Sequence, residues 1–272
     1  MSRPVKRLDC AAIVLAIVFA PIAPAFGADE SRPDDAMIRL GGYGVRDAET
    51  LIRLDSNDAP VGLYVDFEDT LGGETRANVV RLDGLYRFDD WHALGYSWYA
   101  LKFTGYKAIE TDIRWGDQSY SVGTQIDSEV RFDVYKVNYQ YSLFHSEVVE
   151  LGVLAGLHVM RTSVALGATG ASEVRESVNA PLPVFGVFAN HRFSPRWWAN
   201  FNYQLFFVNY EDRVQGGLQD LTVGLEYRLT RHIAFGAALS GFALDLEARD
   251  ESSTLRVNTQ WSGWMFYASQ YF

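Results

Sequence analysis

The chain has 272 residues, of which 34 are acidic and 24 are basic, so its formal net charge at pH 7 is −10. A chain this acidic is a poor candidate for binding nucleic acid, because the phosphate backbone selects basic surfaces. No Pro/Gly/Ser-rich linker, low-complexity run or break in composition divides the sequence. One large domain is therefore the simpler prediction.

The first 27 residues have the pattern of a secretory signal. Basic residues precede an apolar run and small residues follow it: Arg3, Lys6, Arg7, the run 11–20, Ala25 and Gly27. We therefore expect a cleaved signal peptide at 1–27 and one exported domain at 28–272.

The alternative for this segment is a membrane-anchor helix. The apolar run is broken by Pro21 and Pro24 and is shorter than the roughly 20 residues that a spanning helix needs, which disfavours the anchor. Cys10 is the only cysteine, so cleavage would leave a chain without a thiol, as suits an oxidising compartment.

Beyond residue 35, apolar and polar residues alternate in long runs, as in 221–230, where every second residue is apolar. This period of two predicts strands with one apolar and one polar face. Ten strands are predicted, at 36–54, 75–88, 91–108, 126–144, 147–165, 177–193, 196–213, 217–229, 232–249 and 253–272.

The predicted connections alternate between short and long. Tight turns fall at 88–92, 144–147, 193–196 and 229–232, with longer links at 55–74, 109–125 and 166–176 and short polar links near 214–216 and 250–252. This alternation is typical of a closed, antiparallel, up-and-down transmembrane β-barrel, with eight or twelve strands as alternatives to ten. Because the strands exceed the roughly 9–11 residues that cross a bilayer, we expect the barrel to extend beyond the outer surface.

Aromatic residues gather beside the tight turns. We expect them to form a girdle at one membrane interface, because tyrosine and tryptophan favour that position. The predicted interface residues are Phe88, Trp91, Tyr141, Phe193, Trp197, Tyr227 and Phe272.

The end of the chain has apolar residues at alternate positions before a terminal phenylalanine: Trp264, Phe266, Ala268, Gln270 and Phe272, with Gln270 as the departure. This resembles the terminal strand that the outer-membrane assembly machinery recognises. The mature chain is similar to the small OmpA/OmpW-type barrels of Gram-negative bacteria. The resemblance implies the class and an outer-membrane location; it fixes no activity. We expect a monomer, with lipid and lipopolysaccharide as its surroundings and the assembly machinery as a partner of the C-terminal strand.

If the apolar faces meet lipid, the polar faces line the interior. The charged and polar residues expected there are Arg81, Asp83, Arg87, Lys136, His158, Asp220, Glu226 and Arg228. We expect these charges to pair across the interior, for example Arg81, Arg87 or Arg228 with Asp83, Asp220 or Glu226, since buried charges must be paired. A ten-stranded barrel is close to being filled by its own side chains. This favours a structural role or narrow passive permeation; an open, porin-like channel for small solutes is the alternative.

Candidate enzyme sites are weak. The tripeptide His145-Ser146-Glu147 has residue types of a nucleophilic site, but adjacent strand residues point to opposite faces and the tripeptide lies in a tight turn. His158 is expected to be a hydrogen-bonding residue of the interior. We therefore predict no catalytic residue and no cofactor, with an outer-leaflet lipid-modifying enzyme and a loop-mediated adhesin as alternative functions.

The first long link is acidic, with Asp55, Asp58, Asp66, Glu68, Asp69 and Glu74. Such oxygen ligands could hold Ca²⁺ or Mg²⁺, but they lack the spacing of a calcium-binding loop. We expect a solvated loop without a metal.

Two predicted strands break the alternation. The apolar phase shifts between Leu239 and Phe242 and again near Ser262 and Gly263. Both places contain glycine, so the sequence predicts a β-bulge at each.

Overall fold

The computed structural model describes residues 35–56, 63–110, 112–115, 118–168, 174–210, 214–249 and 253–272. The predicted signal peptide at 1–27 and Asp58 lie outside these ranges. Within them, no helix is both long enough and apolar enough to span a membrane.

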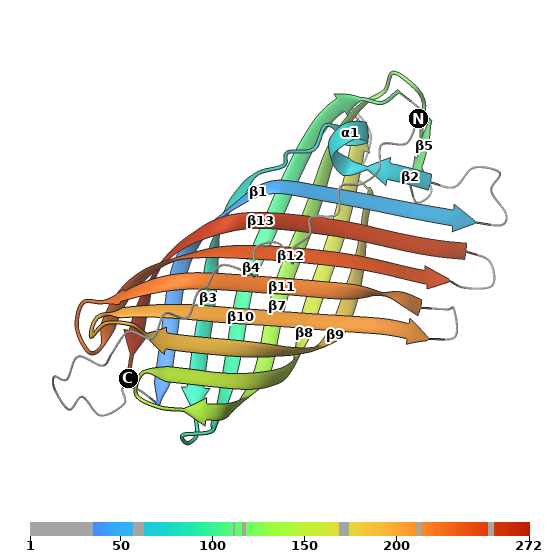
Figure 1. Cartoon of the computed structure of the whole chain (residues 1–272). Coiled ribbons are helices and arrows are strands. Elements are labelled where there is room, and N and C mark those ends of the chain that lie inside the picture. The colour runs from blue at the N-terminus through green and yellow to red at the C-terminus, as the bar shows by residue number, and fades with distance from the viewer. Residues whose placement is uncertain are drawn as a thin grey trace. The chain divides into compact units, whose positions relative to one another are not determined.

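Ten long strands form a closed antiparallel barrel (Figure 1). Each strand pairs with its neighbours along the chain, and the last pairs with the first. They are β1 (Ala36–Ser56), β3 (Ala77–Arg87), β4 (His92–Ala108), β7 (Gln125–His145), β8 (Val149–Ala168), β9 (Val174–Arg192), β10 (Trp197–Tyr210), β11 (Val214–Arg228), β12 (Ile233–Arg249) and β13 (Ser253–Tyr271). The prediction of ten strands in an up-and-down barrel is confirmed, and each predicted strand overlaps one of these.

The polarity of both faces inverts along the strands. In the half of each strand nearest the tight turns (the turn half), the outer face is apolar; on β7, Tyr135, Val137 and Tyr139 are about half exposed there. In the other half (the far half), the outer face of β7 carries Asp127, Glu129, Arg131 and Asp133. The inner face changes in the opposite sense, from Asn138 and Lys136 to the buried Val134, Phe132 and Val130.

The predicted bulges in β12 and β13 are wrong. The two strands pair without a register shift from Leu239 opposite Trp264 to Phe242 opposite Trp261. Apolar residues change from one set of alternate positions to the other because they face lipid in the turn half and face the interior in the far half. Register shifts lie instead in β1, between Arg46 and Glu49 and opposite Ser262 and Gln260 of β13, and in β7, between Ser142 and Phe144.

The far half of the barrel wall separates into two sheets on one side. The ladder between β9 and β10 ends at Phe185 opposite Leu205, although β8 and β9 stay paired as far as Val174. Pro181 and Pro183 lie just beyond this end; a proline has no N–H to donate and is confined to the edges of sheets. In Figure 1 the far ends of β10–β13 and β1 run to the right, whereas those of β4 and β7–β9 run upward.

On the other side, a short helix occupies the gap between the sheets. The ladder between β1 and β3 ends at Val45 opposite Ala77. Beyond it, β2 (Leu63–Asp66) pairs with β1, and α1 (Phe67–Leu71) buries both of its terminal side chains, Phe67 and Leu71. The expected solvated loop is therefore wrong for this part of the chain, which has a buried apolar face.

Aromatic side chains join the two sheets of the far half. Trp261 of β13 stacks on Phe242 with ring centroids 4.2 Å apart and contacts Phe132 of β7 at 5.3 Å. A hairpin of β5 (Ile113–Trp115) and β6 (Gln118–Tyr120) adds the buried Ile113 and Tyr120 to this core. The far half is thus packed like a soluble sandwich, with its apolar side chains inside.

Two substitutions on the outer face of β12 test this inversion. Leu239→Arg places a charge in the apolar belt and should lower the free energy of unfolding by about 2–4 kcal/mol if it lies near mid-bilayer. Asp245→Arg, on the same face but in the far half, should change it by less than about 0.5 kcal/mol. Urea titration of the barrel in lipid vesicles measures both. Equal losses would show that the apolar belt does not end between these residues.

Candidate functional site

Three ion pairs cross or line the interior of the turn half. Lys136 of β7 contacts Asp220 of β11. Arg81 Nε donates to Asp83 Oδ1 at 3.0 Å within β3, and Arg39 Nη2 of β1 donates to Glu226 Oε2 of β11 at 2.8 Å. The first and third of these contacts join strands that are distant in the chain.

The Lys136–Asp220 pair is almost fully enclosed, with both residues 3% exposed. Two ions removed from water lose several kcal/mol of hydration each, so the pair depends on close contact and on further polar or aromatic neighbours. The ring of Tyr99 supplies one such neighbour, lying 5.4 Å from Lys136 Nζ and 5.3 Å from the Arg81 guanidinium carbon. A ring face attracts cations, which offsets part of the lost hydration.

Glu226 is the centre of a second group. Besides Arg39, its carboxylate accepts hydrogen bonds from Ser269 Oγ at 3.2 Å and from the hydroxyl of Tyr271. The guanidinium of Arg228 lies 4.2 Å from the ring centroid of Tyr271. Three strands, β1, β11 and β13, are therefore tied together where the chain closes the barrel.

His158 belongs to the same interior and is 1% exposed. Its Nε2 donates to Gln204 Oε1 at 2.8 Å, and Gln204 Nε2 donates to Asn202 Oδ1 at 2.7 Å. His158 is thus the hydrogen-bonding interior residue that the sequence predicts.

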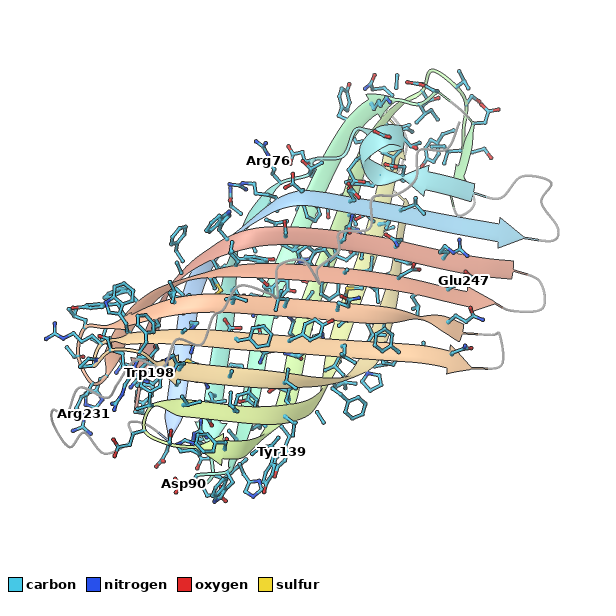
Figure 2. The ribbon with its side chains drawn as sticks, in the orientation of Figure 1. Arg76, Asp90, Tyr139, Trp198, Arg231 and Glu247 are labelled. Atoms are coloured by element: carbon cyan, nitrogen blue, oxygen red, sulfur yellow. The ribbon has the colours of Figure 1, made fainter. Side chains whose placement is uncertain are left out.

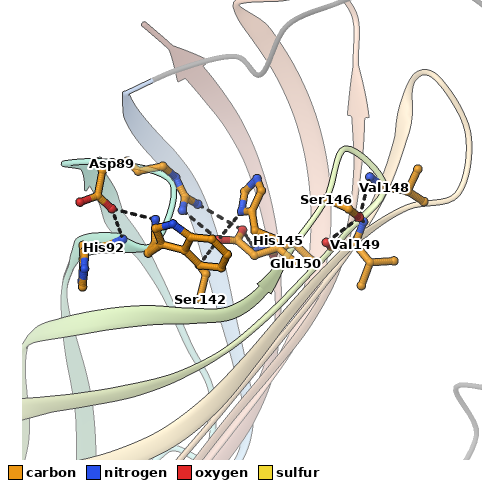
Figure 3. A network of polar contacts seen from close by, with 11 residues as sticks. Asp89, His92, Ser142, His145, Ser146, Val148, Val149 and Glu150 are labelled. Carbon is orange, nitrogen blue, oxygen red and sulfur yellow. Dashed lines mark hydrogen bonds and ion pairs between the residues drawn. The ribbon is translucent and has the colours of Figure 1, made fainter.

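A third group lies at the turns, around Glu150 of β8 (Figure 3). Its carboxylate accepts two hydrogen bonds from Arg87, at 2.8 and 3.1 Å, one from Ser142 Oγ at 2.6 Å and one from Asn190 at 3.0 Å. The imidazole of His145 approaches the same carboxylate, with Nδ1 3.5 Å from Oε1, so the serine and the histidine both contact Glu150.

The tripeptide His145-Ser146-Glu147 forms the adjacent turn. Ser146 Oγ accepts from the backbone N–H of Val149 at 3.0 Å and holds the turn closed (Figure 3). The side chain of Glu147 is exposed, and its contact is with Arg192 at 3.8 Å. The structure thus gives this serine a role in the turn, as the sequence favours.

Arg81 does pair with Asp83, but within β3 and not across the interior as predicted, and the partners predicted for Arg87, Asp220 and Glu226 are wrong. Asp220 pairs with Lys136, Glu226 with Arg39, and Arg87 with Glu150. The prediction missed Arg39 and Glu150, although each alternates with apolar neighbours in the same way as the residues that it included.

The predicted interface aromatics lie beside the turns, and most are exposed on the outer face. Trp197 contacts Tyr227 edge to face at 5.1 Å and stacks with Phe193 at 6.4 Å. Figure 2 shows Asp90 and Arg231 at the turn end of the barrel and Glu247 at the opposite end. The apolar belt therefore begins next to the turns.

The acidic first link uses its carboxylates to build structure. Asp66 caps α1 by accepting from the N–H of Asp69 at 2.8 Å, and Glu68 Oε2 accepts from the N–H of Thr50 at 2.9 Å. Burial raises the pKa of Glu68 to about 7, against the opposing effect of the Thr50 hydrogen bond. Within the described ranges, no group of three or more acidic, histidine or cysteine residues is placed to hold a metal.

A closed barrel with an apolar outer belt, an aromatic interface and a charged interior defines a transmembrane β-barrel of the bacterial outer membrane. Barrels of this class keep their short turns in the periplasm, which places the far half outside the cell.

Comparison with one solved structure supports the same fold, and two others give lower scores. The outer-membrane protease OmpT of Escherichia coli superposes with a TM-score of 0.57 at 8% identity, covering 88% of this chain and 97% of that one. The transport unit of the E. coli autotransporter AIDA-I gives 0.41 at 10% identity, with coverage of 91% and 93%, and the toluene transporter TodX of P. putida gives 0.35 at 9%, with 89% and 91%. No protein-family model and no curated protein sequence matches the chain.

Breaking the central ion pair should be strongly destabilising. Lys136→Met leaves Asp220 buried without its partner and should lower the free energy of unfolding by about 3–5 kcal/mol. The double variant Lys136→Met with Asp220→Leu should lose less, since no charge then remains buried. Arg256→Gln, which removes the exposed contact with Glu247, is the control and should cost less than about 1 kcal/mol. If Lys136→Met matched the control, the pair would not be buried as described.

Docking of α1 should weaken as the pH rises. The folded pKa of Glu68 is raised above the ordinary 4.5, so the stabilisation is complete below about pH 4.5 and is lost as the pH rises through about 7. Hydrogen exchange of the Thr50 amide, corrected for its intrinsic rate, should therefore show less protection at pH 8 than at pH 5. Glu68→Gln keeps an acceptor without the charge and should remove this difference; a difference that persisted in the variant would assign it to another group.

Proposed function

We propose that this protein is an occluded outer-membrane barrel with a structural role. The observation that carries the proposal is the double closure of the bore. In the turn half, buried ion pairs fill the interior, with Lys136, Asp220 and Glu226 each at most 3% exposed. In the far half, the contact of Trp261 with Phe132 joins opposite walls through an apolar core.

Both layers oppose passage of water-soluble molecules. An ion crossing the polar layer would have to separate pairs that have no water to replace their partners. It would then meet a packed apolar layer, where its own hydration would be lost. Narrow passive permeation is the alternative function, and it requires both layers to move.

The proposal contains no catalytic step and no cofactor. It is supported by the hydrogen bonds that engage Ser142, Ser146 and His158 in structural contacts. Two other functions compete with this proposal. One is a lipid-modifying enzyme of the outer leaflet, and the other is an adhesin that acts through the far ends of the strands.

Conductance across a planar bilayer tests the proposal. The purified barrel should give no discrete current steps, whereas a trimeric porin inserted under the same conditions gives them. Expression in a host outer membrane should also leave the mass of lipid A unchanged. Regular current steps from the wild-type barrel would support permeation instead, and a new lipid A mass would support an enzyme.

A further inference from the structure

One segment of the chain, residues 63–76 (the strap), takes the place of β3 in the far half (Figure 1). The ladder between β1 and β3 ends at Val45 opposite Ala77, and beyond it β2 pairs with β1. On its other side the strap reaches β4, where Gly73 forms an isolated bridge with Gly105. It therefore closes the wall between β1 and β4 without a continuous ladder.

Two apolar side chains seat the strap. Phe67 and Leu71, at the two ends of α1, are 2% and 1% exposed. Gly72 ends the helix with a φ of 66°, and a Cβ at Gly73 would overlap the ring of Phe67. A helix of five residues is not stable in water by itself, so the strap keeps its shape only while these side chains are seated.

The same seat buries the carboxylate of Glu68. Its Oε2 accepts from the N–H of Thr50 at 2.9 Å, and the charged groups that act on it, Asp66 on the strap and Glu49 on β1, are both acidic. Among the described residues, no cation is paired with Glu68. Ionisation of Glu68 therefore adds a negative charge that has no counter-ion in the seat.

The other charges around α1 do not compensate. On β4, Lys107 Nζ donates to the backbone carbonyl of Asp69 at 2.7 Å and pairs with Glu110 at 3.3 Å. On β7, Asp127 and Glu129 line the groove beside the end of α1. The surroundings of the strap are thus mainly acidic, and like charges repel.

Seating of the strap is therefore coupled to the pH. Burial raises the pKa of Glu68 from 4.5 to about 7, so the seated strap favours the protonated carboxyl. The stabilisation is complete below about pH 4.5 and is lost as the pH rises through about 7. Across this range the seating equilibrium changes by at most about 300-fold.

We propose that the strap is a pH-dependent closure, which detaches as one unit when Glu68 ionises and opens the far half between β1 and β4. Because the far half lies outside the cell, the strap responds to the pH of the surrounding medium. The ladder between β1 and β3 as far as Val45 and the ion pairs of the turn half take no part in the change. The proposal therefore goes beyond the occluded bore and does not depend on it.

Thiol labelling at position 48 tests the proposal. Ala48 is 1% exposed, and its N–H donates to Thr75 O of the strap. Cys10 is the only cysteine of the chain, so Ala48→Cys in a Cys10→Ser background places a single thiol beside the strap. The barrel is folded in lipid vesicles and labelled with an uncharged maleimide at pH 5 and at pH 8.

Each labelling rate is divided by the rate of an exposed thiol, Ser121→Cys in the same background, which corrects for the effect of pH on the thiol itself. With the wild-type strap, this ratio should rise at least about tenfold from pH 5 to pH 8.

Three further substitutions separate the strap from other causes. Glu68→Gln should keep the ratio low at both pH values. Gly73→Ala, whose added Cβ displaces the ring of Phe67, should give a high ratio at both. Glu247→Gln, which removes an acidic residue of β12 in the far half, is the matched control and should leave the rise unchanged.

Folding of each variant is checked by its gel shift between heated and unheated samples. If Ala48→Cys does not fold, Ala77→Cys, which is 9% exposed at the other edge of the gap, takes its place. A ratio that stays low at pH 8, or is already high at pH 5, would overturn the proposal. A rise that persists in Glu68→Gln, or a low ratio in Gly73→Ala, would overturn it as well.

Discussion

Each long strand of this barrel passes from hydrocarbon into water, and this change of solvent determines where every side chain can lie. In the turn half, lipid covers the outer face, so Tyr135 and Val137 point outward and Lys136 is enclosed. In the far half, water covers the same face, so Asp133 and Arg131 point outward and Phe132 is enclosed. Side chains still point alternately outward and inward, but the apolar face is the outer one in the turn half and the inner one in the far half.

The exchange explains why the interior has two layers with different chemistry. Where the outer face must be apolar, polar side chains are left for the interior, and a charge there needs a partner; Lys136 and Asp220 satisfy this requirement across the barrel. Where the outer face is charged, the interior can be filled with aromatic rings such as Trp261 and Phe242. Both layers close the bore, one by paired charges and the other by dry packing.

Sequence alone predicted the number, the order and nearly the bounds of the strands. The alternation of apolar and polar residues with a period of two is present whether the outer face meets lipid or water. The prediction failed where the exchange of the apolar face produces the same sequence pattern as a β-bulge. The phase shift between Leu239 and Phe242 was interpreted as a bulge, since a single solvent was assumed for the whole outer face. The partners of Asp220 and Glu226 were also not predictable, because they depend on the register across strands far apart in the chain. A readable signal was overlooked in Pro181 and Pro183, which mark β9 as an edge strand.

Separation of the wall into two sheets leaves backbone groups that no neighbouring strand can satisfy, and β1 shows how the chain compensates. Within its register shift, the N–H of Ala48 donates to Thr75 O at 3.1 Å, and just past the shift the N–H of Thr50 donates to the Glu68 carboxylate, so a turn and a helix replace the missing strand. A side-chain acceptor in place of a carbonyl makes this edge sensitive to protonation. The far half therefore combines an aromatic core with one border whose hydrogen bond depends on the charge of Glu68, a dependence that a continuous ladder of backbone hydrogen bonds would not have.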